Sequence, residues 1–185
     1  MADTTNFRNG FTMKLEGAIY EIVDFQHVKP GKGVAFVRTR LKNVETGAVL
    51  ERTFRSGDKV DDLRIEKREM QYLYSEGDTY HFMDLDTYEQ ITVSQSQVGS
   101  GADFLLENGH VYVLVAESKV LGVELPKFVE LEVTFTEPGI RGDTATGATK
   151  PATLQTGAIV SVPLFVNQGD VLRIDTRTGQ YVERA

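Results

Sequence analysis

Hydrophobic and polar residues alternate in short runs along most of the chain. In residues 11–15 every second residue is apolar, and a turn is predicted at Glu16-Gly17. The same period recurs in residues 34–42 and 43–55. Since successive side chains of a strand point to opposite faces, this period predicts strands with one buried face.

Later segments follow the same pattern. Residues 70–93 are typical of a three-strand meander with turns near 76–78 and 85–86. A short helix is predicted only over 101–109, closed by Asn108-Gly109. Further strands are predicted over 110–116, 120–125, 128–137 and 158–166, with a last hairpin around Thr178-Gly179. The fold class predicted from this pattern is all-β.

The spacing of the strands is typical of small barrels. A change in charge near residue 64 and the Pro126-Lys127 pair predict two boundaries. We therefore expect three modules, residues 1–64, 65–127 and 128–185. Each module would be marginal in size alone, so we expect them to support one another.

Residues 138–153 interrupt the alternation. They are rich in glycine, threonine and proline, and Ile140 is their only large apolar residue. A structureless connection of this length is uncommon inside a compact domain. The composition leaves two interpretations open, a disordered segment and a functional loop.

Composition excludes several classes of site. The chain has no cysteine, so it has no disulfide, thiolate nucleophile or cysteine metal ligand. His27, His81 and His110 lack the short spacings of metal-ligand motifs, and no metal is expected. The chain has no run of about 18 apolar residues and no signal-peptide pattern. We expect a cytoplasmic protein without a membrane segment.

Charge is distributed unevenly around the net value of −7. Residues 1–64 hold 11 Lys and Arg against 9 Asp and Glu, a net of +2. Residues 65–127 hold 4 against 11, a net of −7, and residues 128–185 hold 5 against 7, a net of −2. Within residues 25–44 there is no acidic residue, and the cations there are Lys29, Lys32, Arg38, Arg40 and Lys42. This patch is basic within an acidic protein.

The sequence "FQHVKPGKGVAF", residues 25–36, places one lysine at the tip of a predicted hairpin. Pro30 and Gly31 suit the central positions of a type II turn, and Gly33 frees the returning strand of side-chain bulk. A solubilising turn residue is the ordinary interpretation of Lys32. The alternative is a functional lysine that reaches into a narrow space, with the cationic strand face behind it holding phosphates.

Motifs of catalysis are missing. The chain has no nucleophile elbow, Walker loop or dinucleotide fingerprint, and "KPGKG" lacks the spacing of a phosphate-binding loop. Asp84 and Asp86 are two residues apart, which in a strand would place both on one face as a carboxylate pair. A solvated turn is the favoured interpretation. A Schiff-base lysine needs burial or neighbouring cations, and the predicted tip offers Lys32 no apolar pocket. We expect a protein that is not an enzyme and binds no cofactor.

Several stretches together resemble bacterial translation elongation factor P. They are "VKPGKG" followed by "AFVRTRLKNVETG", then "KPATLQTGAIVSVPLFVNQG" at 150–169, the triplet Gly142-Asp143-Thr144, and the ending "YVERA". The stretches occur in the family's order along the whole chain.

The resemblance implies an SH3-like (KOW-type) barrel followed by two OB-type barrels in a tRNA-like shape. It implies a monomeric factor that binds both ribosomal subunits between the peptidyl and exit tRNA sites. There it stimulates peptide-bond formation when consecutive prolines stall the ribosome.

Site residues follow from the same resemblance. Lys32 matches the lysine that a modifying enzyme extends, and its loop would contact peptidyl-tRNA. The residues expected to contact tRNA are Lys29, Pro30, Gly31, Lys32, Gly33, Arg38, Arg40 and Lys42. Gly142, Asp143 and Thr144 match a loop near the exit-site codon. Tyr181 and Arg184 match a C-terminal pair on the small-subunit side.

A general single-stranded RNA-binding or RNA-chaperone protein built from OB barrels is the alternative function. Such a protein needs aromatic side chains along a positive groove, on which bases stack. Most tyrosines lie in residues 65–127, which are strongly acidic. Tight binding to free oligonucleotides would distinguish this alternative from a ribosome-dependent factor.

Overall fold

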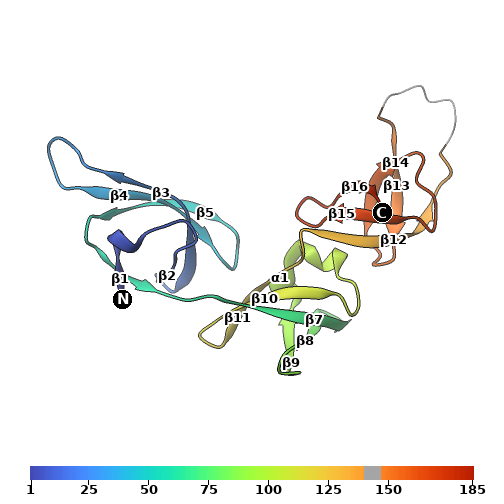
Figure 1. Cartoon of the computed structure of the whole chain (residues 1–185), viewed down its shortest axis with the longest axis horizontal. Helices are drawn as coiled ribbons and strands as arrows, with labels where there is room; N and C mark the ends of the chain where they lie inside the picture. Colours follow the sequence, from blue (N-terminus) through green and yellow to red (C-terminus); the bar gives the residue numbers. More distant parts are fainter. Residues whose placement is uncertain (140–146) are drawn as a thin grey trace. The chain divides into compact units, whose positions relative to one another are not determined.

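Three antiparallel sheets follow one another along the chain (Figure 1). The computed structural model describes residues 1–139 and 147–185. One short α-helix and two 3-10 helices are the only helical elements of these residues. The all-β prediction is confirmed.

The first sheet has six strands in the order β1-β6-β2-β3-β4-β5. They are β1 (Ala2–Asp3), β2 (Thr12–Leu15), β3 (Ala18–Val28), β4 (Phe36–Asn43), β5 (Val49–Arg55) and β6 (Lys59–Asp62), with the 3-10 helix η1 at Thr4–Asn6. The predicted turn between β2 and β3 is confirmed, with positive φ values at Glu16 (51°) and Gly17 (84°).

The second sheet has the order β11-β10-β7-β8-β9. Its strands are β7 (Glu66–Glu76), β8 (Thr79–Asp84), β9 (Gln90–Ser94), β10 (His110–Ala116) and β11 (Lys119–Glu124). The meander β7-β8-β9 was predicted from the alternation and is confirmed.

The helix predicted over 101–109 is misplaced. The α-helix α1 covers Gln95–Val98, and the 3-10 helix η2 covers Gly99–Phe104. The backbone N–H of Ser94 donates to Oε1 of Gln97 at 3.2 Å, which fixes the start of α1. This local cap, rather than a run of apolar residues, begins the helical segment, so the periodicity did not reveal it.

The third sheet has the order β14-β13-β12-β15-β16. Its strands are β12 (Phe128–Thr136), β13 (Thr149–Leu154), β14 (Ile159–Pro163), β15 (Val171–Asp175) and β16 (Gln180–Arg184). The edge strands β14 and β16 also contact each other, so the sheet curls toward closure.

Strand β13 contradicts part of the predicted long loop over 138–153. Residues 149–154 pair with both β12 and β14. Their buried positions are occupied by Lys150, Ala152 and Leu154, of which only leucine is strongly hydrophobic. The alternation was therefore hidden by a charged and a small residue.

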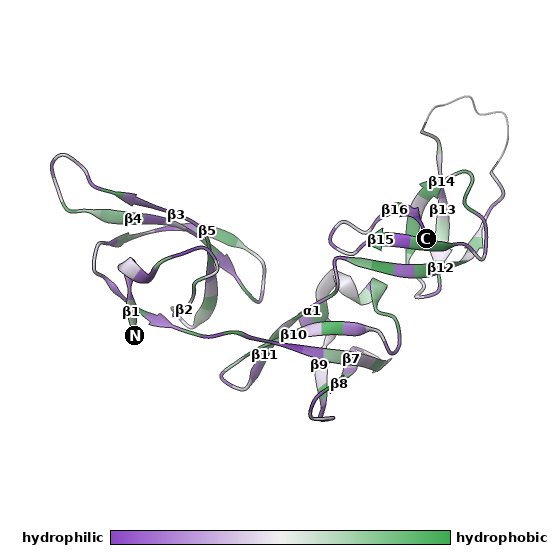
Figure 2. Ribbon diagram, viewed as in Figure 1, coloured by the Kyte–Doolittle hydropathy of each residue, from purple (hydrophilic) through white to green (hydrophobic). Residues whose placement is uncertain are grey.

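Each sheet buries one face. Figure 2 shows the alternation as bands of purple and green along strands such as β10 and β12. The first core contains Met13, Ile22, Val37 and Leu41, all with 0% exposure. The core of the third sheet includes Leu131, Val133, Val162, Leu172 and Ile174. Apolar burial of this kind stabilises each sheet by about 25 cal/mol per Å².

The chain divides into two compact units. One unit comprises residues 1–67 and 114–122, and the other comprises residues 68–113 and 123–185. In the first unit, Lys119 of the β10–β11 hairpin forms an ion pair with Glu45 at 3.2 Å. The predicted boundaries at residues 64 and 127 fall between the three sheets, and the division into three domains stays a prediction.

Within the described residues, none of the helices has the length and apolar character of a membrane span.

Replacing Thr39 by valine is expected to lower the free energy of unfolding by about 1 kcal/mol. Thr39 is fully buried, and its Oγ1 donates a 2.7 Å hydrogen bond to the carbonyl of Arg52, which valine cannot form. Hydrogen exchange of the β4 amides, measured at increasing urea concentrations, gives the change in the free energy of unfolding. Thr53→Val is the matched control on an exposed position of β5, with an expected change within about 0.5 kcal/mol. Equal losses in both variants would contradict the role of this hydrogen bond.

Candidate functional site

The loop between β3 and β4 carries the candidate lysine. The two strands pair as far as Val28 and Phe36, so residues 29–35 form the connection. Figure 1 shows this hairpin extending from the rest of the first sheet. Lys32 is exposed at its tip, and Val34 is 72% exposed. The loop is thus supported by the strands behind it and leaves the amine free to react or bind.

The predicted type II turn at Pro30-Gly31 is wrong. That turn requires a positive φ at Gly31, whereas the positive φ of the loop lies at Gly33, at +114°. The ladder ends at the pair Val28 and Phe36, so the chain reverses over residues 29–35 rather than in a two-residue turn. At Gly33 a Cβ would lie 3.7 Å from Cγ of Pro30, an ordinary contact. Backbone conformation, rather than lack of space, therefore calls for glycine beside Lys32.

Strand β4 presents its cations on the solvent face, as the alternation predicted. Val37, Thr39 and Leu41 point inward with 0% exposure. The residues between and after them, Arg38, Arg40 and Lys42, are exposed. The structure brings these three side chains onto one face of the sheet, behind the loop of Lys32.

Acidic residues of the neighbouring strands stand opposite two of these three cations. Arg40 is paired with Asp24 of β3 and Glu51 of β5, and Lys42 is paired with Glu21. Directly paired residues of antiparallel strands lie on the same face, so carboxylates flank the cations. Residues 25–44 contain no acid, yet the strand face is close to charge balance. Only the register, which shifts between Ile22 and Asp24, reveals this arrangement.

The C-terminal pair has structural contacts of its own. Tyr181 is partly buried against the core of the third sheet. The guanidinium of Arg184 lies 3.7 Å from a carboxylate oxygen of Asp170 and 5.6 Å from the ring centre of Phe165. Phe165 is 57% exposed, and sequence reasoning missed it as a neighbour of Arg184.

The predicted triplet Gly142-Asp143-Thr144 lies outside the described residues.

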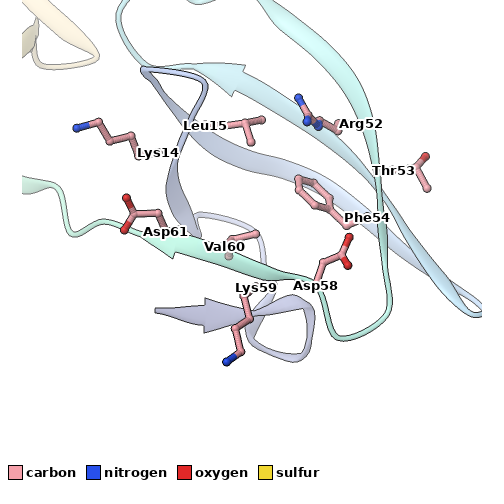
Figure 3. Close-up of a pocket in the computed structure, with 9 residues that line it drawn as sticks. All are labelled: Lys14, Leu15, Arg52, Thr53, Phe54, Asp58, Lys59, Val60 and Asp61. Carbon is pink, nitrogen blue, oxygen red and sulfur yellow. The ribbon is translucent and has the colours of Figure 1, made fainter.

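A shallow pocket lies in the first sheet (Figure 3). It has a volume of 370 Å³ and is lined by Lys14, Leu15, Arg52, Thr53, Phe54, Asp58, Lys59, Val60 and Asp61. Arg52 is already paired with Glu16 at 2.8 Å. In Figure 3 the amines of Lys14 and Lys59 point away from Arg52 and Phe54. The charged side chains that line this pocket are of both signs and do not point toward one common atom position. The pocket therefore lacks the converging groups of a catalytic site.

Asp84 and Asp86 form a turn, as preferred from the sequence. The Asp84 carboxylate accepts the backbone N–H groups of Asp86 at 2.8 Å and Thr87 at 3.1 Å. The N–H groups of Thr87 and Asp86 hold the pKa of the Asp84 carboxyl below its ordinary value. Asp84 is only 6% exposed, so this end of the turn is less solvated than predicted.

Across residues 1–139 and 147–185, no three His, Asp or Glu side chains form a group that could hold a metal ion.

Comparison with known proteins accounts for almost the whole chain. Residues 3–60 match the elongation factor P (EF-P) KOW-like domain, residues 65–123 match the elongation factor P OB domain, and residues 129–184 match elongation factor P, C-terminal. The KOW-like and OB matches agree with the expected barrel types.

Two curated relatives are named elongation factor P. The one from Pelotomaculum thermopropionicum is 59% identical over 184 residues, and the one from Moorella thermoacetica is 56% identical over 185 residues. In both cases 100% of each chain is covered.

A solved structure is similar to part of the chain. Eukaryotic translation initiation factor 5A from Methanococcus jannaschii has a TM-score of 0.55 and 28% sequence identity. The similarity covers 92% of that chain and 66% of this one. Because three domain matches follow one another along the chain and relatives more than half identical cover it from end to end, the chain belongs to the elongation factor P family of translation elongation factors.

Proposed function

We propose that this elongation factor binds the ribosome between the peptidyl and exit tRNA sites and stimulates peptide-bond formation at consecutive prolines. The observation that carries the proposal is Lys32, exposed at the tip of an extended hairpin loop in a chain of this family. The loop would reach toward the acceptor end of peptidyl-tRNA. The ribosome would then perform the chemistry.

The factor's contribution in this proposal is positioning. A peptidyl-prolyl end reacts poorly when it samples unproductive orientations, and restraint of the reacting groups lowers the barrier. Such restraint is worth several kcal/mol, on the order of 10³-fold in rate. A flexible lysine extended by a modifying enzyme has the length to reach a narrow site, and the glycines beside it leave room.

Roles are assigned to the other site residues in the same way. Lys29, Pro30, Gly31 and Gly33 would shape and hold the loop against tRNA, and the cations of β4 would contact its phosphates. Gly142, Asp143 and Thr144 would lie near the exit-site codon. Tyr181 and Arg184 would face the small subunit, with Arg184 held by Asp170 in the free protein. The factor would act as a monomer.

Lys32→Ala and Lys32→Arg are both expected to fold like the parent, to bind ribosomes measurably, and to lose about tenfold or more of the rescue at proline runs. Arginine keeps the charge but lacks the amine that a modifying enzyme extends. The measurement is the rate of synthesis through a triple-proline sequence with factor purified from its own host. Lys29→Ala removes an equal charge from the same loop and should lose less. Full activity of Lys32→Arg would show that charge alone suffices.

Neutralising the β4 cations as Arg38→Gln, Arg40→Gln and Lys42→Gln should weaken ribosome binding and flatten its dependence on salt. Each lost phosphate contact lowers the slope of log affinity against log salt by about one. Affinity titrations over a range of salt concentrations measure the slope. The matched control is Glu21→Gln, Asp24→Asn and Glu51→Gln, which removes the opposing carboxylates and should not weaken binding. An unchanged slope in the cation variant would mean that this face does not meet RNA.

Replacing Asp143 and Thr144 together by alanine should leave the fold intact, because a polar segment of this composition contributes little to a core. Rescue of stalled ribosomes should fall, since hydrogen bonds to RNA near the exit-site codon would be lost. Thermal unfolding and the triple-proline assay measure the two quantities. Rescue and ribosome affinity both equal to the parent's would refute the assignment.

A further inference from the structure

Phe165 is an exposed aromatic residue to which the proposed function gives no role. It lies in the connection between β14 and β15, and 57% of it is exposed. The next residue, Val166, is fully buried in the core of the third sheet. The Val166 backbone N–H donates to the carbonyl of Pro163 at 3.2 Å. The exposed ring therefore belongs to a segment whose backbone is anchored by its neighbour.

The far end of the same connection is also held. The Asn167 backbone N–H donates to Oδ2 of Asp170 at 2.9 Å. The Gly169 backbone N–H donates to the carbonyl of Val133 at 2.9 Å, which ties the connection to β12. A ring on such a support has little backbone freedom to lose when a partner covers it.

Arg184 lies beside this ring. Its guanidinium carbon is 5.6 Å from the ring centre of Phe165, within the range of a cation–π contact. The guanidinium is also 3.7 Å from Oδ2 of Asp170, but the Arg184 side chain is 52% exposed. An exposed ion pair of this kind is weak, so the guanidinium can exchange its carboxylate for another anion. An accessible ring and an accessible cation thus stand side by side.

The chemistry of this pair favours RNA over an apolar protein surface. Unpaired bases stack on aromatic rings, and an arginine binds the phosphates that accompany them. A protein pocket that enclosed the ring would also take Arg184 and Asp170 out of water, which costs several kcal/mol per ion. A base stacked on Phe165 covers the ring and leaves the guanidinium in solvent, next to a phosphate.

We propose that Phe165 and Arg184 form a stacking site for one unpaired base of the small-subunit ribosomal RNA. The site rests on the proposed function, which places Tyr181 and Arg184 on the small-subunit side. Phe165 supplies the face on which the base stacks, and Arg184 contacts the phosphate. Tyr181 packs partly against the core of the third sheet and so has less of its ring to offer.

The test is a substitution series at residue 165 in the full-length protein, with affinity measured on ribosomes stalled at a triple-proline sequence. Phe165→Leu keeps an apolar side chain and removes the ring, and it should bind about tenfold more weakly. Phe165→Trp offers a larger ring and should bind at least as tightly as the parent. A protein pocket shaped for phenylalanine would accept leucine better than tryptophan, and that order would overturn the proposal. Thermal unfolding of both variants should match the parent's, because the ring is exposed.

Chemical probing identifies the base. Dimethyl sulfate and a carbodiimide together modify all four bases, and one base of the small-subunit RNA should become less reactive with the parent and with Phe165→Trp. The same base should stay reactive with Phe165→Leu. Protection of that base by Phe165→Leu, or protection confined to the message, would contradict the site.

Phe135→Leu is the matched control, since it makes the same change at a ring of the third sheet that is 59% exposed. It should keep the parent's affinity and the parent's pattern of base reactivity. Equal losses in Phe135→Leu and Phe165→Leu would show that exposed rings of this sheet matter only in a general way, and would overturn the proposal.

Lys32→Ala, measured in parallel, separates the stacking site from the proposed function. Rescue by Phe165→Leu should return when its concentration is raised about tenfold, because only affinity is lost, whereas rescue by Lys32→Ala should not return. Full rescue by Lys32→Ala would refute the proposed function itself. Loss of rescue by Lys32→Ala together with parental affinity of Phe165→Leu would refute only the stacking site and leave Phe165 as an ordinary exposed residue.

Discussion

The pairing of β3 with β4 is the constraint on which the candidate loop depends. The loop is exposed, so its position is set by the strands that carry it. Strand β3 has 11 residues and β4 has 8, and their ladder continues to Val28 and Phe36 at the base of the loop. The inward side chains of β4 are fully buried, which anchors the ladder in the first core. The paired strands therefore fix the direction in which the loop and Lys32 extend from the first sheet.

Charge reinforces the distinction between the loop and the strand face behind it. Arg40 and Lys42 of β4 stand opposite acidic residues of the neighbouring strands, whereas Lys29 and Lys32 lie beyond the last paired residues. A protein with a net charge of −7 is repelled by RNA at long range, and salt screens this repulsion over about 8–10 Å. The local positive charge at the tip therefore matters most at short range, where the loop meets its partner. This arrangement favours contact at one place over general binding to nucleic acid.

The third sheet shows a second way of supporting a polar connection. Its core is apolar apart from a few buried polar groups, among them Lys150 and Thr136. Both donate to backbone carbonyls near the ends of β12 and β13. Unpaired carbonyls at the end of a strand are costly when they are buried, so these side chains stabilise the place where the ladder stops. A long hairpin ladder supports one loop, and side-chain donors support the ends of the other connection.

The alternation of residues was sufficient to predict an all-β chain, most of its strands and the face on which the β4 cations lie. These features depend on the two-residue period of a strand, which is local and readable from the sequence. The resemblance in "VKPGKG" and "KPATLQTGAIVSVPLFVNQG" likewise identified the family, because those motifs are contiguous. Strand β13 was missed where a buried lysine and an alanine replaced the expected apolar residues.

Tertiary structure alone decided which residues far apart in the sequence meet. Asp24 and Glu51 are paired with Arg40 because of a register that includes a shift in β3. The Glu137 carbonyl meets the Lys150 ammonium because two strands end side by side. The backbone conformation of the tip, with its positive φ at Gly33, depends on where β3 and β4 stop pairing. A sequence records each residue's own preference, whereas these contacts depend on register and strand ends, which are properties of the whole sheet.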